Sequence, residues 1–204
     1  MHLVFDIFQG IGVAAAVGIR PFLPALVVGA LAAGDVQIDF KGSHFAFLQG
    51  TPFLLAMVVL AILLALAEGR LARERLGQGP GALVLGALAL ALGALLFAGS
   101  LSRGHYLVWP GYAGGVICAA VGLAATRPLL ARVRAALDAA RTRDDDGPTL
   151  NLLPLYEEGG ALVLAALSVI APPVGPVGLV LLLWLFYRGR RREDRKYAGL
   201  RILR

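Results

Sequence analysis

Charged residues are scarce in this sequence of 204 residues, where Asp, Glu, Lys and Arg together make up only 16%. Hydrophobic residues make up 58%, and the mean hydropathy is +0.77. A composition this poor in charge argues against an ordinary soluble domain and is typical of an integral membrane protein. The single cysteine, Cys118, lies in an apolar run and excludes an internal disulfide.

The sequence also lacks the motifs of the common enzyme classes. It contains no G-x-S-x-G, no H-E-x-x-H and no P-loop. His2, His44 and His105 stand in termini or loops without the spacing of metal ligands. We therefore expect no catalysis, no metal and no cofactor.

Long apolar stretches predict a single all-α transmembrane domain over residues 1–190, with six spans, because about 20 apolar residues are needed to cross a bilayer. The predicted spans cover residues 7–33, 52–67, 80–99, 106–126, 155–171 and 174–187. The last two are short, with Pro172, Pro173 and Pro176 at their junction. They predict either a thin hairpin that crosses the membrane or a re-entrant one.

Basic residues are unevenly divided between the connections. Alternate connections and the C-terminal segment carry nearly all of the arginines, whereas the others carry only Lys41 and Arg103. The positive-inside rule then predicts that both termini are cytoplasmic. The net charge of +6 sits in these short segments, so we expect anionic lipid head groups as partners and no nucleic acid.

Two basic segments are predicted to lie outside the membrane core. In residues 128–141 the apolar side chains and the basic side chains fall on different helical faces, which predicts an amphipathic helix lying on the cytoplasmic surface. Pro128 suits the first turn of such a helix. Residues 191–204 are predicted to form a basic cytoplasmic tail.

Arg20 is the most informative residue, because an arginine deep inside an apolar span costs at least about 2.5 to 3.5 kcal/mol. Pro21 disfavours helix at the residue before it and suits the first turn of a new helix. The sequence therefore predicts a first span that is broken at Arg20-Pro21. The positive end of the second half-helix would lie beside the guanidinium and create an anion site. Alternatively, Arg20 pairs permanently with a structural carboxylate or with backbone carbonyls.

Glu157 and Glu158 open the fifth span. Carboxylates are favourable at a helix N-terminus, so both can be simply interfacial. Alternatively, one points into the bundle as the partner of Arg20, as a proton carrier or as a cation ligand. With Gly18, Arg20 and Pro21, these two residues make up the predicted substrate site.

Small residues recur at intervals of four in the first and fourth spans, as Gly10, Ala14 and Gly18 and as Gly114, Cys118 and Gly122. Such faces predict close contact between helices. The segments that begin at Val13 and at Ile117 also resemble each other. With three spans in each half, this likeness is compatible with an inverted repeat.

The segments GIGVAAAVGIRPFLPALVVGAL, FAFLQGTPFLL and LYEEGGALVLAALSVIAPP resemble a bacterial membrane family known as domain of unknown function 4126. Its motifs are a Gly-x-Arg in a Pro-containing first helix and an acidic start to the fifth. Here Glu-Glu-Gly-Gly stands where one acidic residue followed by apolar residues is expected. The resemblance implies the fold and a membrane location, and implies nothing about a substrate.

Together these patterns predict a small transporter or flippase-like permease in the bacterial inner membrane, acting on an anionic solute or a lipid head group. The alternative is a non-transporting scaffold or accessory subunit that binds a partner membrane protein or a second copy of itself. A closed contact between Arg20 and a carboxylate favours the scaffold. A water-accessible cavity that reaches Arg20 favours transport.

Overall fold

The computed structural model describes residues 2–70, 80–102, 104, 106–141 and 153–200, and within these ranges all of the regular structure is helical. The predicted all-α fold is therefore confirmed. The helices are α1 (His2–Ile19), α2 (Phe22–Ala33), the short 3₁₀ helix η1 (Ala46–Gln49), α3 (Thr51–Arg70), α5 (Pro80–Ser102), α6 (Trp109–Arg141), α7 (Leu153–Ile170) and α8 (Val174–Leu200).

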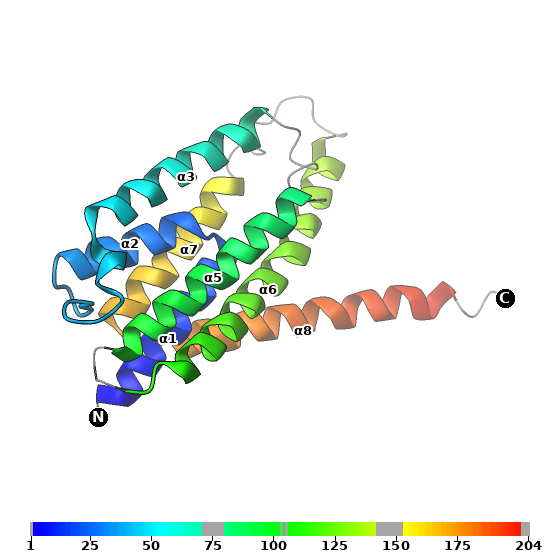
Figure 1. The fold of residues 1–204 in the computed structure, drawn as a ribbon. Coiled ribbons are helices and arrows are strands. Elements are labelled where there is room, and N and C mark those ends of the chain that lie inside the picture. The colour runs from blue at the N-terminus through cyan, green and yellow to red at the C-terminus, as the bar shows by residue number, and fades with distance from the viewer. Residues whose placement is uncertain (1, 71–79, 103, 105, 142–152, 201–204) are drawn as a thin grey trace.

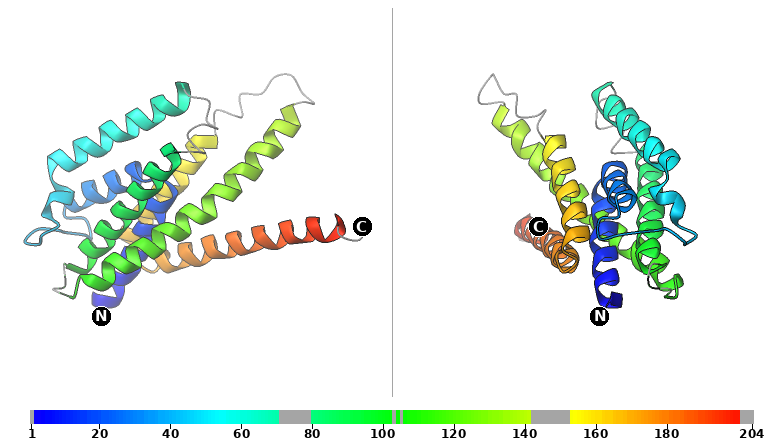
Figure 2. Two further views of the ribbon diagram at one scale, coloured as in Figure 1. Left: turned by 45° about the vertical axis from the view of Figure 1, so that its right-hand side comes forward. Right: turned by 90° about the vertical axis from the view of Figure 1, so that its left-hand side faces the viewer.

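Helix α1 lies at the centre of the bundle, where it contacts α5, α6, α7 and α8 (Figures 1 and 2). Helix α2 packs between α3 and α7. Glycine allows these close contacts: a Cβ at Gly18 would lie 2.1 Å from the backbone oxygen of Ala119 in α6. A Cβ at Gly122 would lie 2.3 Å from the oxygen of Ala15. The small-residue faces of the first and fourth spans thus meet each other, as predicted.

The first apolar stretch is broken where predicted, since α1 ends at Ile19 and α2 begins at Phe22. Pro21 is the N-cap of α2. Pro24 lies within its first turn, where a backbone N–H has no helical partner and its loss costs nothing. The break is more than a kink, because α2 reverses direction and leads back toward the end of the bundle where α1 begins.

The direction of α2 follows from its contacts. Phe22 lies beside Ala61 and Leu64 late in α3, whereas Gly29 packs against Leu54 early in α3. Helix α2 therefore runs antiparallel to α3 and returns to the end of the bundle that holds the start of α1 (Figure 1). Residues 7–33 therefore form a helical hairpin and not one straight helix, because hydropathy measures the length of an apolar stretch and not its direction.

Helix α6 contradicts the prediction of a separate surface helix. It runs without interruption from Trp109 to Arg141 and has Pro128 in its interior. A single proline removes one helical hydrogen bond, and here the helix continues past it. The segments that begin at Val13 and at Ile117 therefore fold differently, one as a hairpin and one as a continuous helix, which removes the structural basis for a repeat. The side chains of residues 129–141 lie outside the described set.

Helix α8 likewise extends beyond the span predicted for residues 174–187 and continues to Leu200. It begins beside α1 and then runs away from the bundle (Figures 1 and 2). Most of the predicted basic tail is thus helical, and residues 201–204 lie outside the described part of the chain. The Arg188 guanidinium carbon lies 4.9 Å from the centre of the Trp184 ring.

Two helical segments among the described residues, Gly81–Ser102 and Trp109–Thr126, are long and apolar enough to cross a membrane. Shorter apolar helices include Thr51–Ala67 and Val174–Arg188. The two long apolar segments indicate membrane association. The six spans predicted from the sequence are not established by this criterion.

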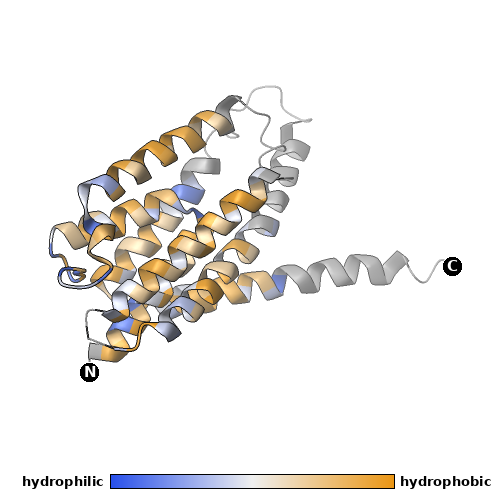
Figure 3. Ribbon diagram, viewed as in Figure 1, coloured by the Kyte–Doolittle hydropathy of each residue, from blue (hydrophilic) through white to orange (hydrophobic). Residues whose placement is uncertain are grey.

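The distribution of side-chain size agrees with a lipid surround. Small residues such as Ala14, Ala15 and Ala16 are fully buried. Many large apolar side chains are exposed, and Figure 3 shows that hydrophobic residues predominate along the described helices. On α3 and α5 the exposed large residues are Leu55, Val58, Val59, Ile62, Leu63, Leu66, Leu83, Val84 and Leu88. Soluble monomers rarely expose apolar surface on this scale.

We expect Gly18→Ala to destabilise the bundle by about 1 to 3 kcal/mol, because the new methyl group would force α1 away from the backbone of α6. The matched control is Gly160→Ala in α7, where a Cβ meets nothing within 4 Å. This control should raise stability by about 0.5 to 1 kcal/mol through helix propensity. Denaturation of the purified protein in detergent measures both changes. Equal effects of the two variants would contradict this packing.

Candidate functional site

The turn between α1 and α2 carries the buried arginine. The Arg20 N–H donates to the oxygen of Ala16 at 3.1 Å, which is the last helical bond of α1. Pro21 then directs the chain into α2, so the guanidinium lies at the tip of the α1–α2 hairpin. Arg20 is only 7% exposed. Its predicted orientation toward the interior of the bundle is confirmed.

A buried ion pair joins this hairpin tip to α7. Arg20 Nη2 donates to Glu157 Oε2 at 3.1 Å, and both side chains are 9% exposed. Among the alternatives left open for Glu157, the role of Arg20 partner is therefore the one that the geometry confirms. A buried charge of either sign is very costly when its partner is removed, so the pair holds the tip of the hairpin against α7.

The sequence predicts an anion site at Arg20, and the Glu157 carboxylate is the anion that the structure places there. The start of α2 offers free N–H groups and the positive end of a helix dipole, and the guanidinium adds a full charge. In this structure the protein's own carboxylate binds the guanidinium. Glu157 therefore neutralises the charge of Arg20 in this conformation.

The space beside this ion pair is small. A cavity of about 10 Å³ is lined by Arg20, Pro21 and Glu158 together with four apolar residues: Phe22, Leu23, Ala61 and Leu64. This volume holds at most about one water molecule. Gly18 is not among the lining residues, and it packs against Ala119 instead. The structure therefore brings together four of the five predicted site residues, while Gly18 positions the helices.

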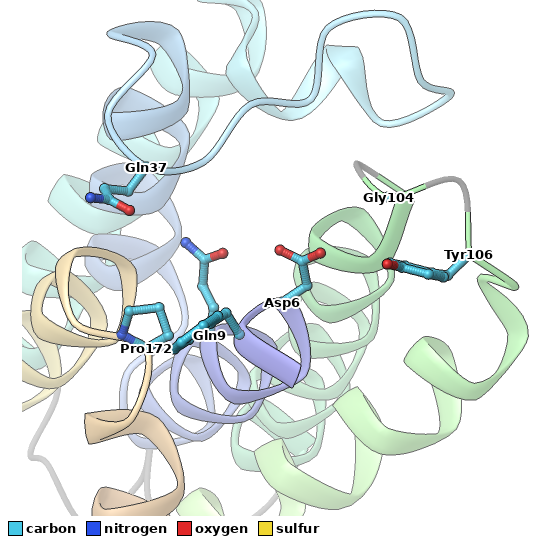
Figure 4. Close-up of a pocket in the computed structure, with 7 residues that line it drawn as sticks. Asp6, Gln9, Gln37, Gly104, Tyr106 and Pro172 are labelled. Atoms are coloured by element: carbon cyan, nitrogen blue, oxygen red, sulfur yellow. The ribbon is translucent and has the colours of Figure 1, made fainter. Parts of the chain in front are cut away.

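A much larger cavity, of about 580 Å³, lies at the opposite end of α1 (Figure 4). The start of α1 contributes Phe5, Asp6 and Gln9 to its wall. The remaining lining residues come from three connections and are Gln37, Gly104, Tyr106 and Pro172. Asp6 and Gln9 are 7% and 3% exposed, although both are polar.

Sequence reasoning missed this cavity. The available signal was the pair Asp6 and Gln9, which are three residues apart and hence lie on one face of an apolar helix. Polar residues of this kind inside a membrane helix point to a functional interior. The predicted first span begins at residue 7 and so leaves Asp6 outside it.

Residues 7–192 match the family described as Domain of unknown function (DUF4126). The chain belongs to the DUF4126 family. The match covers most of the chain and confirms the resemblance drawn from its motifs. No curated protein and no solved structure matches the chain.

The two motifs on which the DUF4126 resemblance rests meet in space. The Gly-x-Arg of α1 supplies Arg20, and the acidic start of α7 supplies Glu157. Of the two adjacent glutamates, Glu157 forms the ion pair, and Glu158 lines the small cavity beside it. The geometry therefore assigns the pairing role within Glu-Glu-Gly-Gly to its first residue.

We expect Glu157→Ala to destabilise this DUF4126 protein by about 3 to 5 kcal/mol, because it leaves the Arg20 charge buried without its carboxylate. The double variant Arg20→Ala/Glu157→Ala should lose less than Glu157→Ala alone. Glu158→Ala is the matched control and should change stability little. Denaturation in detergent of Arg20→Ala, Glu157→Ala and the double variant measures the coupling. Additive effects of the two single substitutions would show that the pair contributes nothing.

Proposed function

We propose that this protein is a small multi-pass permease of the bacterial inner membrane. The observation that carries the proposal is a polar cavity of about 580 Å³ at one end of an otherwise apolar bundle. Buried polar groups are expensive in a membrane protein and line solute paths where they occur. The cavity would be the open entrance for a solute.

The Arg20–Glu157 pair would be the closed gate at the far end. Helix α1 leads from Gln9 in the cavity wall to Arg20, which at 1.5 Å per residue is about 16 Å along its axis. Broken helices are common at the binding sites of transporters. A cavity at one end of the bundle and an ion pair at the other would match one state of an alternating-access cycle, in which the apolar contacts of α1 between them must separate before a solute can pass.

The anionic substrate expected from the sequence required Arg20 to face the ligand. Glu157 now supplies that negative charge. We therefore propose a polar solute whose passage separates the ion pair, in place of an anion bound permanently by Arg20.

The alternative function is a non-transporting scaffold or accessory subunit. One specific observation favours it: the ion pair is closed, and the cavity beside it is only about 10 Å³. In that case Arg20 and Glu157 would only hold the hairpin to α7, and lipid or a partner helix would cover the outer apolar faces.

Uptake into proteoliposomes separates the two functions. We expect the purified protein to take up at least one of three radiolabelled probes, namely sorbitol, choline or phosphate, faster than protein-free vesicles. Glu157→Gln should change this rate at least tenfold, because it weakens the gate, whereas the adjacent Glu158→Gln should not. Uptake of no probe above the protein-free rate would overturn the permease and favour the scaffold.

The membrane layout follows from the hairpin and the distribution of charge. The ends of α3 and α6, together with the connections that follow them, carry eight arginines, so we propose that this end of the bundle is cytoplasmic. The cavity end then faces outward, together with Lys41 and the start of α1. Helices α3, α5, α6, α7 and α8 would cross the membrane, and α1 and α2 would form a helical hairpin entered from outside. The C-terminus remains cytoplasmic in this layout.

Reporters fused to the two ends of the chain test this layout. An N-terminal reporter should be external and a C-terminal one cytoplasmic, because five crossings place the two ends on opposite faces. A single crossing by residues 7–33 would instead place both ends in the cytoplasm. The matched control is a reporter inserted at residue 75, which is cytoplasmic in either layout. A cytoplasmic N-terminus would contradict the hairpin arrangement.

A further inference from the structure

The cavity at the start of α1 has the dimensions of a ligand site. Its volume of about 580 Å³ falls within the range of roughly 300 to 1,000 Å³ that is usual for pockets binding small molecules. Its wall combines α1 with the connections that follow α2, α5 and α7. The α2 connection is held in place by Ile38 and Phe40, which are 2% and 0% exposed.

Gln9 is the residue that points to a ligand. Its side chain projects into the cavity in Figure 4, and the residue is 3% exposed. The amide nitrogen Nε2 has no hydrogen-bond partner among the residues that the structure describes. Buried polar groups are nearly always hydrogen-bonded, and an exception calls for an explanation. A bound molecule with an acceptor oxygen would complete the bonding of this amide.

Asp6 lies one turn earlier on α1. Its carboxylate is a hydrogen-bond acceptor, whereas the Gln9 amide nitrogen is a donor. Its carboxylate points into the same cavity (Figure 4), and the residue is 7% exposed. An ionised carboxylate accepts several hydrogen bonds, so it can accept from a ligand in addition to the contact that it already makes. The backbone oxygen of Asp6 accepts from Ser100 Oγ at 3.2 Å, which fixes this turn against α5.

The Asp6 carboxylate and the Gln9 amide nitrogen together determine which charge a ligand can carry. An anion would be repelled by the Asp6 carboxylate at close range. A simple ammonium or metal cation has no acceptor to offer Gln9. A neutral molecule with several hydroxyl groups offers both donors and acceptors, and Phe5, Tyr106 and Pro172 provide apolar surface for its C–H groups.

We propose that this cavity binds a small neutral polyhydroxyl compound, such as a polyol or monosaccharide unit, through Gln9 and Asp6. The inference deepens the proposed function by naming its substrate class, and in that respect rests on it. The same chemistry is present in a free polyol and in the sugar head group of a glycolipid.

Isothermal titration calorimetry on the full chain tests the proposal, in a detergent that has no sugar head group. The probes are sorbitol, octyl glucoside below its micellar concentration, choline and phosphate. We expect saturable binding of sorbitol if the ligand is free, or of octyl glucoside alone if it is a lipid head group. Binding of choline or phosphate without either hydroxyl probe, or no binding of any probe, would overturn the proposal.

Two variants and a control separate binding from folding. Gln9→Leu should weaken binding at least tenfold and at the same time raise thermal stability, because it removes a buried amide nitrogen that has no partner. Asp6→Asn should also weaken binding. Asp35→Asn, at an exposed carboxylate paired with Lys41 and outside the cavity wall, should leave binding unchanged. Undiminished binding by Gln9→Leu would overturn the assignment.

The outcome is distinguishable from that of the uptake experiment. Binding of a hydroxyl probe without uptake would retain the ligand site and overturn the permease. Uptake of phosphate or choline together with no binding of a hydroxyl probe would retain the permease and overturn this ligand class.

Discussion

The ion pair between Arg20 and Glu157 is the constraint on which the arrangement of the bundle depends. It joins the tip of the α1–α2 hairpin to α7, although the two residues lie 137 positions apart in the sequence. An arginine at the end of an apolar helix cannot remain there without a partner, so the hairpin must bring its tip to a carboxylate. Helix α2 then packs between α3 and α7.

The remaining packing is arranged around α1 and uses small residues. Gly12 faces Ser168 and Gly175, and Gly18 faces Ala119, at distances that leave no room for a Cβ. In a bilayer the lipid is as apolar as leucine, so burial of large side chains gives little driving force for helix association. Close backbone contact is the alternative, and it accounts for the glycine contacts of α1 and for its fully buried Ala14, Ala15 and Ala16.

The parts of the fold that depend on local chemistry are predictable from the sequence. The break at Arg20-Pro21 is one example, because a proline acts within one turn of the chain. The buried orientation of Arg20 is another, since its charge leaves few options. The return of α2 toward the start of α1 is not predictable in this way. It depends on the contact with α3 and on Glu157, and hydropathy reads the whole stretch as one span.

Pro21 marks a helix break as predicted, whereas the helix start predicted at Pro128 is wrong. Pro21 follows a buried charge and has Pro24 three residues later, so two prolines share the first turn of α2. Pro128 stands alone, and α6 continues through it to Arg141. The cavity could not be predicted for a different reason. Its lining residues come from four separate segments of the chain, and only Asp6 and Gln9 show any pattern in the sequence.

A rigid α1 would couple the two ends of the molecule. Gln9 lies on α1, and Arg20 follows its last residue directly; the helix contains no proline and is packed between α5, α6, α7 and α8. A ligand that displaced Gln9 would displace the helix as a unit, because no proline interrupts its hydrogen bonds. The Arg20 guanidinium would move with it relative to Glu157 on α7. A change at the cavity would therefore reach the ion pair without any flexible element between them.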